Sequence, residues 1–278
     1  MHKLGVYVAG TVALNPSNSS VTLVRSGSRI TLKEEHHGHP LSRYIAGQIP
    51  YYYREPKAIG ADFAARHDAL EMILALFSQS PTTAKFQNSH CGEILSSIFL
   101  EEVVGYRRLL CKLTLTTAED TNVHKMDGFF VKTTCDPFQY LFVEAKTSIL
   151  PTDKTKFSGH RHGILKQMIT SLGAYDKVDE RFDFTRIRDN LEHGFSPTEA
   201  KQIRSDLVPP GPSNAAYVGV AVTNKQTIDQ GDDDYILSAK SDKQFDFYGL
   251  VVVDLKQLAK ESYEHGKIIT DVTNSGTA

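Results

Sequence analysis

An aspartate, a glutamate and a lysine stand where the sequence can bring them together around a cation. Asp127 lies in one strongly apolar run, and Glu144 and Lys146 end a second one. Both runs are rich in aromatic and β-branched residues, which is typical of buried strands. Residues 133–137 between them have the composition of a turn. We therefore expect the two runs to pair as an antiparallel hairpin.

This pairing would create a metal site. Side chains alternate across a strand, so Glu144 and Lys146 share one face, and a neighbouring strand about 4.8 Å away can place Asp127 beside Glu144. Two carboxylates that close repel each other unless a cation lies between them, and oxygen ligands suit Mg²⁺ or Mn²⁺. The metal would polarise a phosphodiester, while Lys146 orients the attacking water or neutralises charge on the phosphate. A Glu-x-Lys triplet alone is also common at exposed strand ends.

A second glutamate, Glu93, lies upstream in a helix that we predict over residues 89–106. Apolar residues recur there at helical spacing, among them Ile94 and Ile98. Acidic side chains are favoured near a helix N-terminus by the helix dipole. On these grounds alone, helix stability explains Glu93 better than a place in the metal site does.

The composition is that of an ordinary globular protein and limits how the chain can bind DNA. It has 278 residues, 40% hydrophobic and 23% charged, with a net charge of −2. A protein that grips DNA alone normally carries a basic surface, so this balance favours a partner that supplies DNA affinity. One local basic cluster follows the Lys146 strand and is the predicted DNA-binding surface: Lys154, Lys156, His160, Arg161, His162 and Lys166.

The sequence carries no sign of a membrane or secreted protein. It lacks any apolar run of about 18 residues, and its N-terminus lacks the apolar core of a signal peptide. Cys91, Cys111 and Cys135 lack metal-ligand spacing and favour a reducing compartment. We therefore expect a cytoplasmic protein.

The remaining pattern predicts an α/β or α+β fold, with a mixed central sheet flanked by helices. Further helices are expected over residues 62–77, 163–175 and 255–265 and from Ser196 onward, and further strands over residues 109–116, 215–223 and 247–254. Residues 51–53 are expected in a loop or edge strand, 229–234 in an acidic loop and 270–278 in a frayed tail. We divide the chain into an N-terminal strand and loop region, 1–60, with partner binding as one interpretation, and a main domain, 61–278.

Three other clusters contain metal-ligating residue types but lack the rest of a metal site. The histidines at 36, 37, 39, 160 and 162 are not supported by a Cys pair or a His-Glu-x-x-His helix. The acidic residues 232–234 lack the rest of a calcium loop. The chain also lacks a P-loop, so we do not expect it to bind ATP.

The order of these features resembles the PD-(D/E)xK nuclease core of many restriction enzymes and repair nucleases. That core has a helix with an acidic residue, matched by Glu93, a strand with the central metal ligand, matched by Asp127, and a strand ending in Glu-x-Lys, matched by Glu144 and Lys146. The resemblance implies that the three acids hold Mg²⁺ or Mn²⁺, that the backbone carbonyl of Ala145 adds a ligand, and that Lys146 is the catalytic lysine.

Two details depart from this core or stay open. Met126 stands where the proline of the motif's name would precede the aspartate, and many members also lack it. Gln167 and Tyr175 in the following helix are candidates for a further site residue, but their spacing does not match the usual pattern.

A closer likeness is to the HamA family, the nuclease subunit of the Hachiman antiphage system. Residues 92–95, 126–128 and 143–146 look like landmarks of that family, and the likeness covers roughly residues 60–260. It implies a stable partnership with a superfamily 2 helicase, HamB. It also implies metal-dependent DNA cleavage that is restrained until the helicase acts on invading or damaged DNA.

Two other functions remain open on the sequence. A non-catalytic adaptor could keep a nuclease-like fold only to bind a helicase, although converging carboxylates have no use there. A stand-alone restriction-type endonuclease would need a recognition surface and usually dimerisation, and neither can be read from these residues. Cleavage by the purified protein separates the first from a nuclease, and discrete digestion products identify the second.

Overall fold

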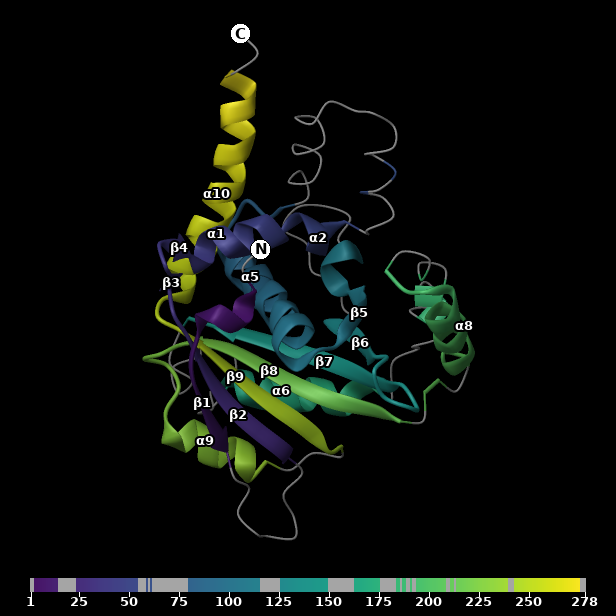
Figure 1. Cartoon of the computed structure of the whole chain (residues 1–278). Coiled ribbons are helices and arrows are strands. Elements are labelled where there is room, and N and C mark those ends of the chain that lie inside the picture. Colours follow the sequence, from purple (N-terminus) through teal and green to yellow (C-terminus); the bar gives the residue numbers. More distant parts are fainter. Residues whose placement is uncertain are drawn as a thin grey trace.

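The computed structural model defines a seven-stranded mixed sheet with helices on both faces and a separate two-stranded sheet (Figure 1). The residues that it describes are 3–14, 24–54, 59, 61, 80–115, 126–149, 163–175, 184–185, 187–188, 191, 194–208, 211–212, 214–239 and 243–275. Its strands are β1 Val8–Leu14, β2 Val24–Leu32, β3 Glu35–His36, β4 His39–Pro40, β5 Arg107–Cys111, β6 Gly128–Lys132, β7 Gln139–Ser148, β8 Ala215–Asn224 and β9 Phe245–Val252.

Its helical elements lie between these strands and at the C-terminal end. The α-helices are α1 Leu41–Gln48, α2 Pro50–Tyr53, α5 Ala84–Phe99, α6 Gly163–Ala174, α8 Pro197–Asp206, α9 Gln230–Leu237 and α10 Leu255–Ser275. Two 3₁₀ turns, η1 Leu4–Tyr7 and η3 Lys112–Leu115, and one π turn, η2 Leu100–Val104, complete them. None of the helices that the structure describes is long and apolar enough to cross a membrane.

The main sheet has the strand order β1-β2-β9-β8-β7-β6-β5. Strands β5, β6 and β7 pair as an antiparallel meander, which contains the predicted hairpin of β6 and β7, whereas β7, β8, β9 and β2 run parallel. Strand β1 returns antiparallel at the far edge. The predicted mixed sheet flanked by helices is confirmed. Strands β1 and β2 of the N-terminal region extend this same sheet, and the boundary at residue 60 stays a prediction.

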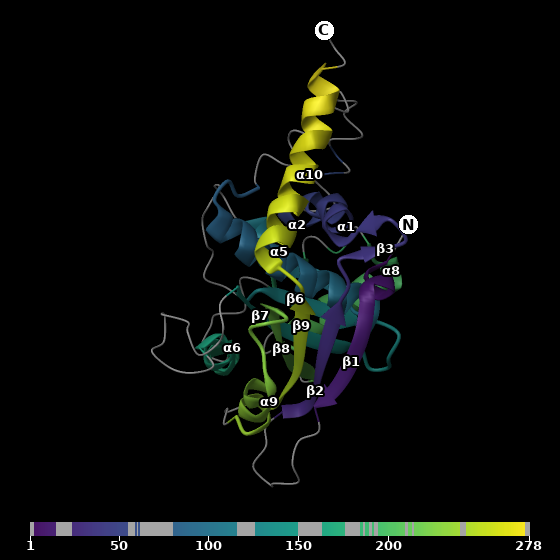
Figure 2. The same ribbon diagram turned by 90° about the vertical axis from the view of Figure 1, so that its left-hand side faces the viewer.

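The alternation of side chains along the strands divides the interior into two cores. On one face Phe130, Val143 and Val220 belong to the core shared with α1, α5 and α10. On the other face Phe129 and Phe142 belong to the core shared with α6, α8 and α9. Figures 1 and 2 show α5 and α10 on one side of the sheet and α6 and α9 on the other. Strand β7 is therefore buried on both faces, as its nearly continuous apolar sequence predicts.

Several predicted helices and strands are confirmed close to their expected bounds. Ser196 caps α8 with a capping box to Glu199, as its sequence pattern predicts. Helix α6 and strands β8 and β9 form where their apolar patterns place them. Helix α10 begins at Leu255, as expected. The predicted helix over residues 62–77 lies outside the described residues.

Other boundaries differ from the predictions for identifiable reasons. The strand expected over 109–116 ends at Cys111, because Cys111 pairs with Gly128 at the start of β6 and the chain then has no further partner in that strand. Helix α5 begins before residue 89, and the left-handed Gly105 ends the π turn that follows it.

Three segments expected to be irregular are helical. The acidic loop over 229–234 forms the start of α9, because the side chains of Asp229 and Asp232 each accept the other's backbone N–H in a capping box. Residues 51–53 form α2, with Pro50 in the first turn, where its missing N–H costs nothing. The expected frayed tail belongs to α10 as far as Ser275.

Helix α5 lies against β7 with almost no space between them at one point. A Cβ atom added to Gly92 would lie 2.0 Å from Oγ1 and 2.9 Å from Cβ of Thr147, which is closer than atoms can approach. Only glycine permits this contact, and the next residue in the helix is Glu93. The close packing therefore brings the Glu93 backbone directly against the strand that carries Glu144 and Lys146.

Substituting Gly92 by alanine tests this contact. We expect Gly92→Ala to lower the free energy of unfolding by about 1–3 kcal/mol, because the added methyl group overpacks the interface with Thr147. Gly173→Ala in α6 is the matched control, since no atom lies within 4 Å of its added Cβ. Chemical denaturation monitored by circular dichroism measures both variants. Equal stability of the two would contradict the packing described.

Candidate active site

The candidate site lies where β7 continues beyond the end of β6. The last pair between these strands joins Gly128 to Val143, whereas β7 stays paired with β8 through Ser148. Beyond Val143, β6 therefore offers no backbone partner to β7. The Asp127 carboxylate fills this position, and its Oδ2 accepts the backbone N–H of Ala145 at 2.8 Å.

A lysine that the sequence analysis did not single out binds the other oxygen of Asp127. The Lys112 ammonium donates to Asp127 Oδ1 at 2.7 Å, and its Nζ lies 3.9 Å from Glu93 Oε1. The backbone N–H of Lys112 also donates to the Asp127 carbonyl oxygen at 3.1 Å. Lys112 is the first residue of η3, immediately after β5 ends. The end of the β5–β6 ladder thus positions both members of this pair.

Glu93 reaches the site from the face of the sheet that α5 covers, opposite to the face on which Glu144 contacts Tyr175. It lies in the middle of α5 rather than in its first turn, so the helix dipole does not account for it. Its side chain is buried, and its Oε2 has no hydrogen-bond partner. Burial and the neighbouring Asp127 carboxylate raise the pKa of Glu93 to about 8. A buried, unpartnered carboxylate oxygen is costly for folding, which favours a purpose other than stability.

Glu144 and Lys146 share one face of β7, as their spacing predicts. The Lys146 ammonium forms a hydrogen-bonded ion pair with Glu144 Oε1. The Tyr175 hydroxyl lies 2.5 Å from Glu144 Oε2 and 2.8 Å from the Val143 carbonyl oxygen. Burial, together with the Asp127 carboxylate, raises the pKa of Glu144. Both oxygens of this carboxylate are therefore held in place.

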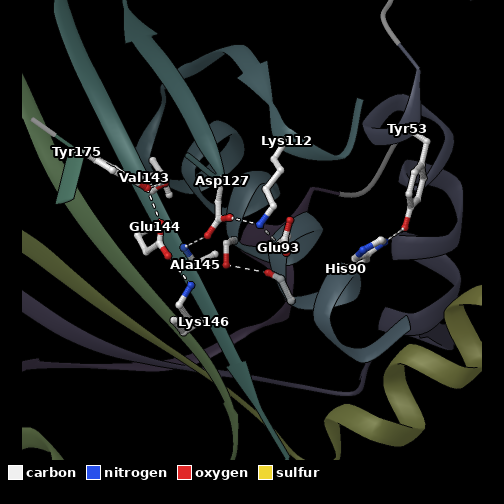
Figure 3. A network of polar contacts seen from close by, with 12 residues as sticks. Tyr53, His90, Glu93, Lys112, Asp127, Val143, Glu144, Ala145, Lys146 and Tyr175 are labelled. Atoms are coloured by element: carbon white, nitrogen blue, oxygen red, sulfur yellow. Dashed lines mark hydrogen bonds and ion pairs between the residues drawn. The ribbon is translucent and has the colours of Figure 1, made fainter. Parts of the chain in front are cut away.

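Figure 3 shows how these side chains lie. Asp127 lies between Lys112 on one side and the Ala145 backbone on the other, and Glu144 with Lys146 follows on β7. Burial opposes the charged form of Lys146, but the Asp127 and Glu144 carboxylates outweigh it and raise the pKa of Lys146. The structure thus brings Glu93, Asp127, Glu144 and Lys146 together from segments far apart in the chain.

The chemistry of these groups fits a hard divalent cation. Three carboxylates supply the oxygen donors that Mg²⁺ and Mn²⁺ prefer, and Glu93 Oε2 is free to accept a ligand bond. In an extended strand the N–H and C=O of one residue point to the same side, so the Ala145 carbonyl also faces Asp127. Within the described part of the chain, no three His, Cys, Asp or Glu side chains are arranged to hold a metal as they stand. Metal ligation by these residues therefore stays a prediction.

The predicted DNA-binding residues lie mostly beyond what the structure describes. Only Lys166 falls within it, as an exposed residue of α6. The others, Lys154, Lys156, His160, Arg161 and His162, lie outside the described residues. Their contact with DNA stays a prediction.

Two residues of the site were missed or left open by the sequence. Lys112 lies between the apolar residues Cys111 and Leu113 of an alternating run. The alternation indicates that its side chain points away from theirs, but it does not indicate that this side chain contacts Asp127. Tyr175 was a candidate without matching spacing, and its hydroxyl contacts Glu144, whereas its part in the site stays a prediction.

The raised pKa of Glu93 predicts how stability changes with pH. The folded protein keeps a proton on Glu93 at pH values where the unfolded chain has released it, so stability falls as the pH rises from about 4.5 to about 8. Glu93→Gln removes this loss. In EDTA at pH 8 we expect the variant to be more stable than wild type by about 4 kcal/mol, with the difference vanishing near pH 5.

Thermal unfolding of wild type and Glu93→Gln across this pH range checks the prediction. Glu264→Gln, at an exposed position of α10, serves as the control for loss of one carboxylate. A pH-independent difference between wild type and Glu93→Gln would show that Glu93 is not the buried acid described.

Comparison with known proteins agrees with the likeness seen in the sequence. No curated protein matches the chain. The HamA family model matches residues 17–265, which is most of the 278 residues. The match includes all four predicted catalytic residues and both Lys112 and Tyr175. The chain belongs to the HamA family.

Proposed function

We propose that the chain is a metal-dependent DNA nuclease with a site of the PD-(D/E)xK type, and that it serves as the effector subunit of a Hachiman antiphage complex. The observation that carries the proposal is the gathering of Glu93, Asp127 and Glu144 in one buried position beside a lysine. Buried carboxylates this close oppose folding. Their convergence from α5, β7 and the segment before β6 therefore favours a functional cause.

Each residue has a definable part in phosphodiester hydrolysis. Glu93, Asp127, Glu144 and the Ala145 carbonyl would hold the cation, which when bound polarises the phosphate and lowers the pKa of a coordinated water. Lys146, held in the site by Glu144, neutralises charge that develops on the phosphate or orients the attacking water.

Tyr175 restrains the catalytic carboxylate rather than touching the substrate. Its hydroxyl lies between Glu144 Oε2 and the Val143 carbonyl oxygen, so it limits rotation of the Glu144 side chain. We propose it as a positioning residue for the metal ligand.

Family membership and charge support a partner that delivers DNA. The HamA family belongs to the Hachiman system, in which the partner is a superfamily 2 helicase of the HamB type. The net charge of −2 provides little unspecific DNA affinity. We therefore propose that DNA reaches the site through the helicase, with Lys166 and the basic residues over 154–162 as the local contacts.

A non-catalytic adaptor is the second candidate, and one observation favours it. Lys112 and Lys146 already neutralise Asp127 and Glu144, so the acidic cluster is partly satisfied by the protein's own cations. An adaptor, however, gives no reason for Glu93 to remain buried with an unpartnered oxygen. Cleavage activity decides between the two.

Alanine in place of Lys146 tests the proposed nuclease. In the complex with its helicase, with Mg²⁺ or Mn²⁺ and ATP, we expect Lys146→Ala to cut plasmid DNA about 10²–10³-fold more slowly, because the charge on the phosphate is no longer neutralised. Initial rates from agarose gels give the ratio. Lys225→Ala, at an exposed residue after β8, is the matched control and should cut at the wild-type rate.

Two outcomes would overturn the nuclease. One is a folded Lys146→Ala variant that cuts as fast as wild type. The other is cleavage by the wild-type complex that persists at full rate in EDTA. Absence of cleavage in every wild-type preparation, with intact helicase activity, would favour the adaptor.

A further inference from the structure

Lys112 occupies the position between two of the carboxylates proposed to hold the metal. Its ammonium lies 2.7 Å from Asp127 Oδ1 and 3.9 Å from Glu93 Oε1. It enters from η3, whereas Lys146 enters from β7 on the far side of Asp127 (Figure 3). The proposed reaction assigns a function to Lys146 but none to Lys112.

Both oxygens of Asp127 are engaged in this arrangement. Oδ2 accepts the Ala145 N–H, and Oδ1 accepts the Lys112 ammonium. A divalent ion bound to Asp127 and Glu93 would need the oxygen and the space that Lys112 takes. It would also stand next to a buried positive charge, and two such cations repel strongly where little water screens them. The ammonium and the metal are therefore alternatives for one position.

Two features of Lys112 favour movement of its side chain without movement of its main chain. Its backbone N–H is fixed to the Asp127 carbonyl oxygen, so the main chain stays anchored. Its side chain is 15% exposed, compared with 4% for Asp127, so part of the side chain already reaches solvent. A lysine side chain is a flexible stem with a compact charge, and it can swing outward by rotamer changes alone.

We propose that Lys112 is an internal cation that fills the metal position of the resting site, and that a divalent ion binds by displacing its ammonium group from Asp127. This inference rests on the proposed function, because it assumes that Glu93 and Asp127 are metal ligands. It adds that, without metal, the Lys112 ammonium occupies the metal position. Metal occupancy is then set by a competition between the ion and Lys112.

Mn²⁺ binding to charge variants of Lys112 tests the competition. Isothermal titration calorimetry is performed on the purified full chain without DNA, for wild type, Lys112→Gln and Lys112→Arg. Removing the competing charge should make Lys112→Gln bind Mn²⁺ about tenfold or more tightly than wild type. Lys112→Arg keeps the charge and should stay close to wild type.

The same variants give a stability readout that a simple structural contact would not produce. Without metal, Lys112→Gln should melt at a lower temperature than wild type, because Asp127 loses its counter-ion. Saturating Mn²⁺ should raise the melting temperature of this variant by more than it raises that of wild type. Arg29→Gln, which breaks the ion pair of Arg29 with the buried Asp233, is the matched control. It should also lose stability but bind Mn²⁺ with wild-type affinity.

A measurement on the wild-type protein covers the case in which Lys112→Gln does not fold. Acylation of lysines with acetic anhydride, read by mass spectrometry, reports whether the Lys112 ammonium is paired. Mn²⁺ should increase labelling of Lys112 severalfold and leave the exposed Lys225 unchanged. Unchanged or reduced labelling of Lys112 at saturating Mn²⁺ would overturn the displacement.

The outcomes separate this inference from the proposed function. If wild type binds Mn²⁺ and Lys112→Gln binds it equally or more weakly, the competition is wrong but the metal site stands. If wild type and all folded variants fail to bind Mn²⁺, the proposed metal site is itself wrong, and the displacement falls with it.

Discussion

The mutual repulsion of three buried carboxylates is the interaction on which the rest of this structure depends. Burial, followed by the nearby Asp127 carboxylate, raises the pKa of both Glu93 and Glu144, and all three side chains are buried. The protein offsets this repulsion with Lys112, Lys146, a backbone N–H and a tyrosine hydroxyl, each on one carboxylate oxygen. Glu93 Oε2 is left without a partner. The cluster is therefore held together by cations of the chain, and Glu93 Oε2 is left for the divalent ion that we propose.

Two features of the fold bring the acids together. Strand β7 extends past β6, so the Asp127 side chain, rather than a neighbouring strand, accepts the Ala145 N–H. Helix α5 approaches β7 at Gly92, so Glu93 reaches the same position from the opposite face of the sheet. The site thus lies where β7 has no β6 partner, at a point that side chains from both faces of the sheet reach.

The parts of this arrangement that follow from local patterns were predictable from the sequence. Alternation and apolar content were enough for the hairpin of β6 and β7, and so for the shared face of Glu144 and Lys146. The start of α5 was not predictable from its apolar stripe, which begins later than the helix, and this error made Glu93 look like a residue of the first turn. The position of Lys112 beside Asp127 depends on where the β5–β6 pairing ends, and this end is set by the two strands together rather than by a local pattern. The resemblance to the PD-(D/E)xK core, not periodicity, led to the prediction that Glu93 belongs to the site.

A structure of the crystalline protein soaked in Mn²⁺ tests the central claim most directly, because anomalous scattering locates the ion without reference to activity. Our account predicts a peak within bonding distance of carboxylate oxygens of Glu93, Asp127 and Glu144 and of the Ala145 carbonyl, with the Lys112 ammonium moved away from Asp127. An ion bound elsewhere, with Lys112 still on Asp127 at saturating Mn²⁺, would contradict it.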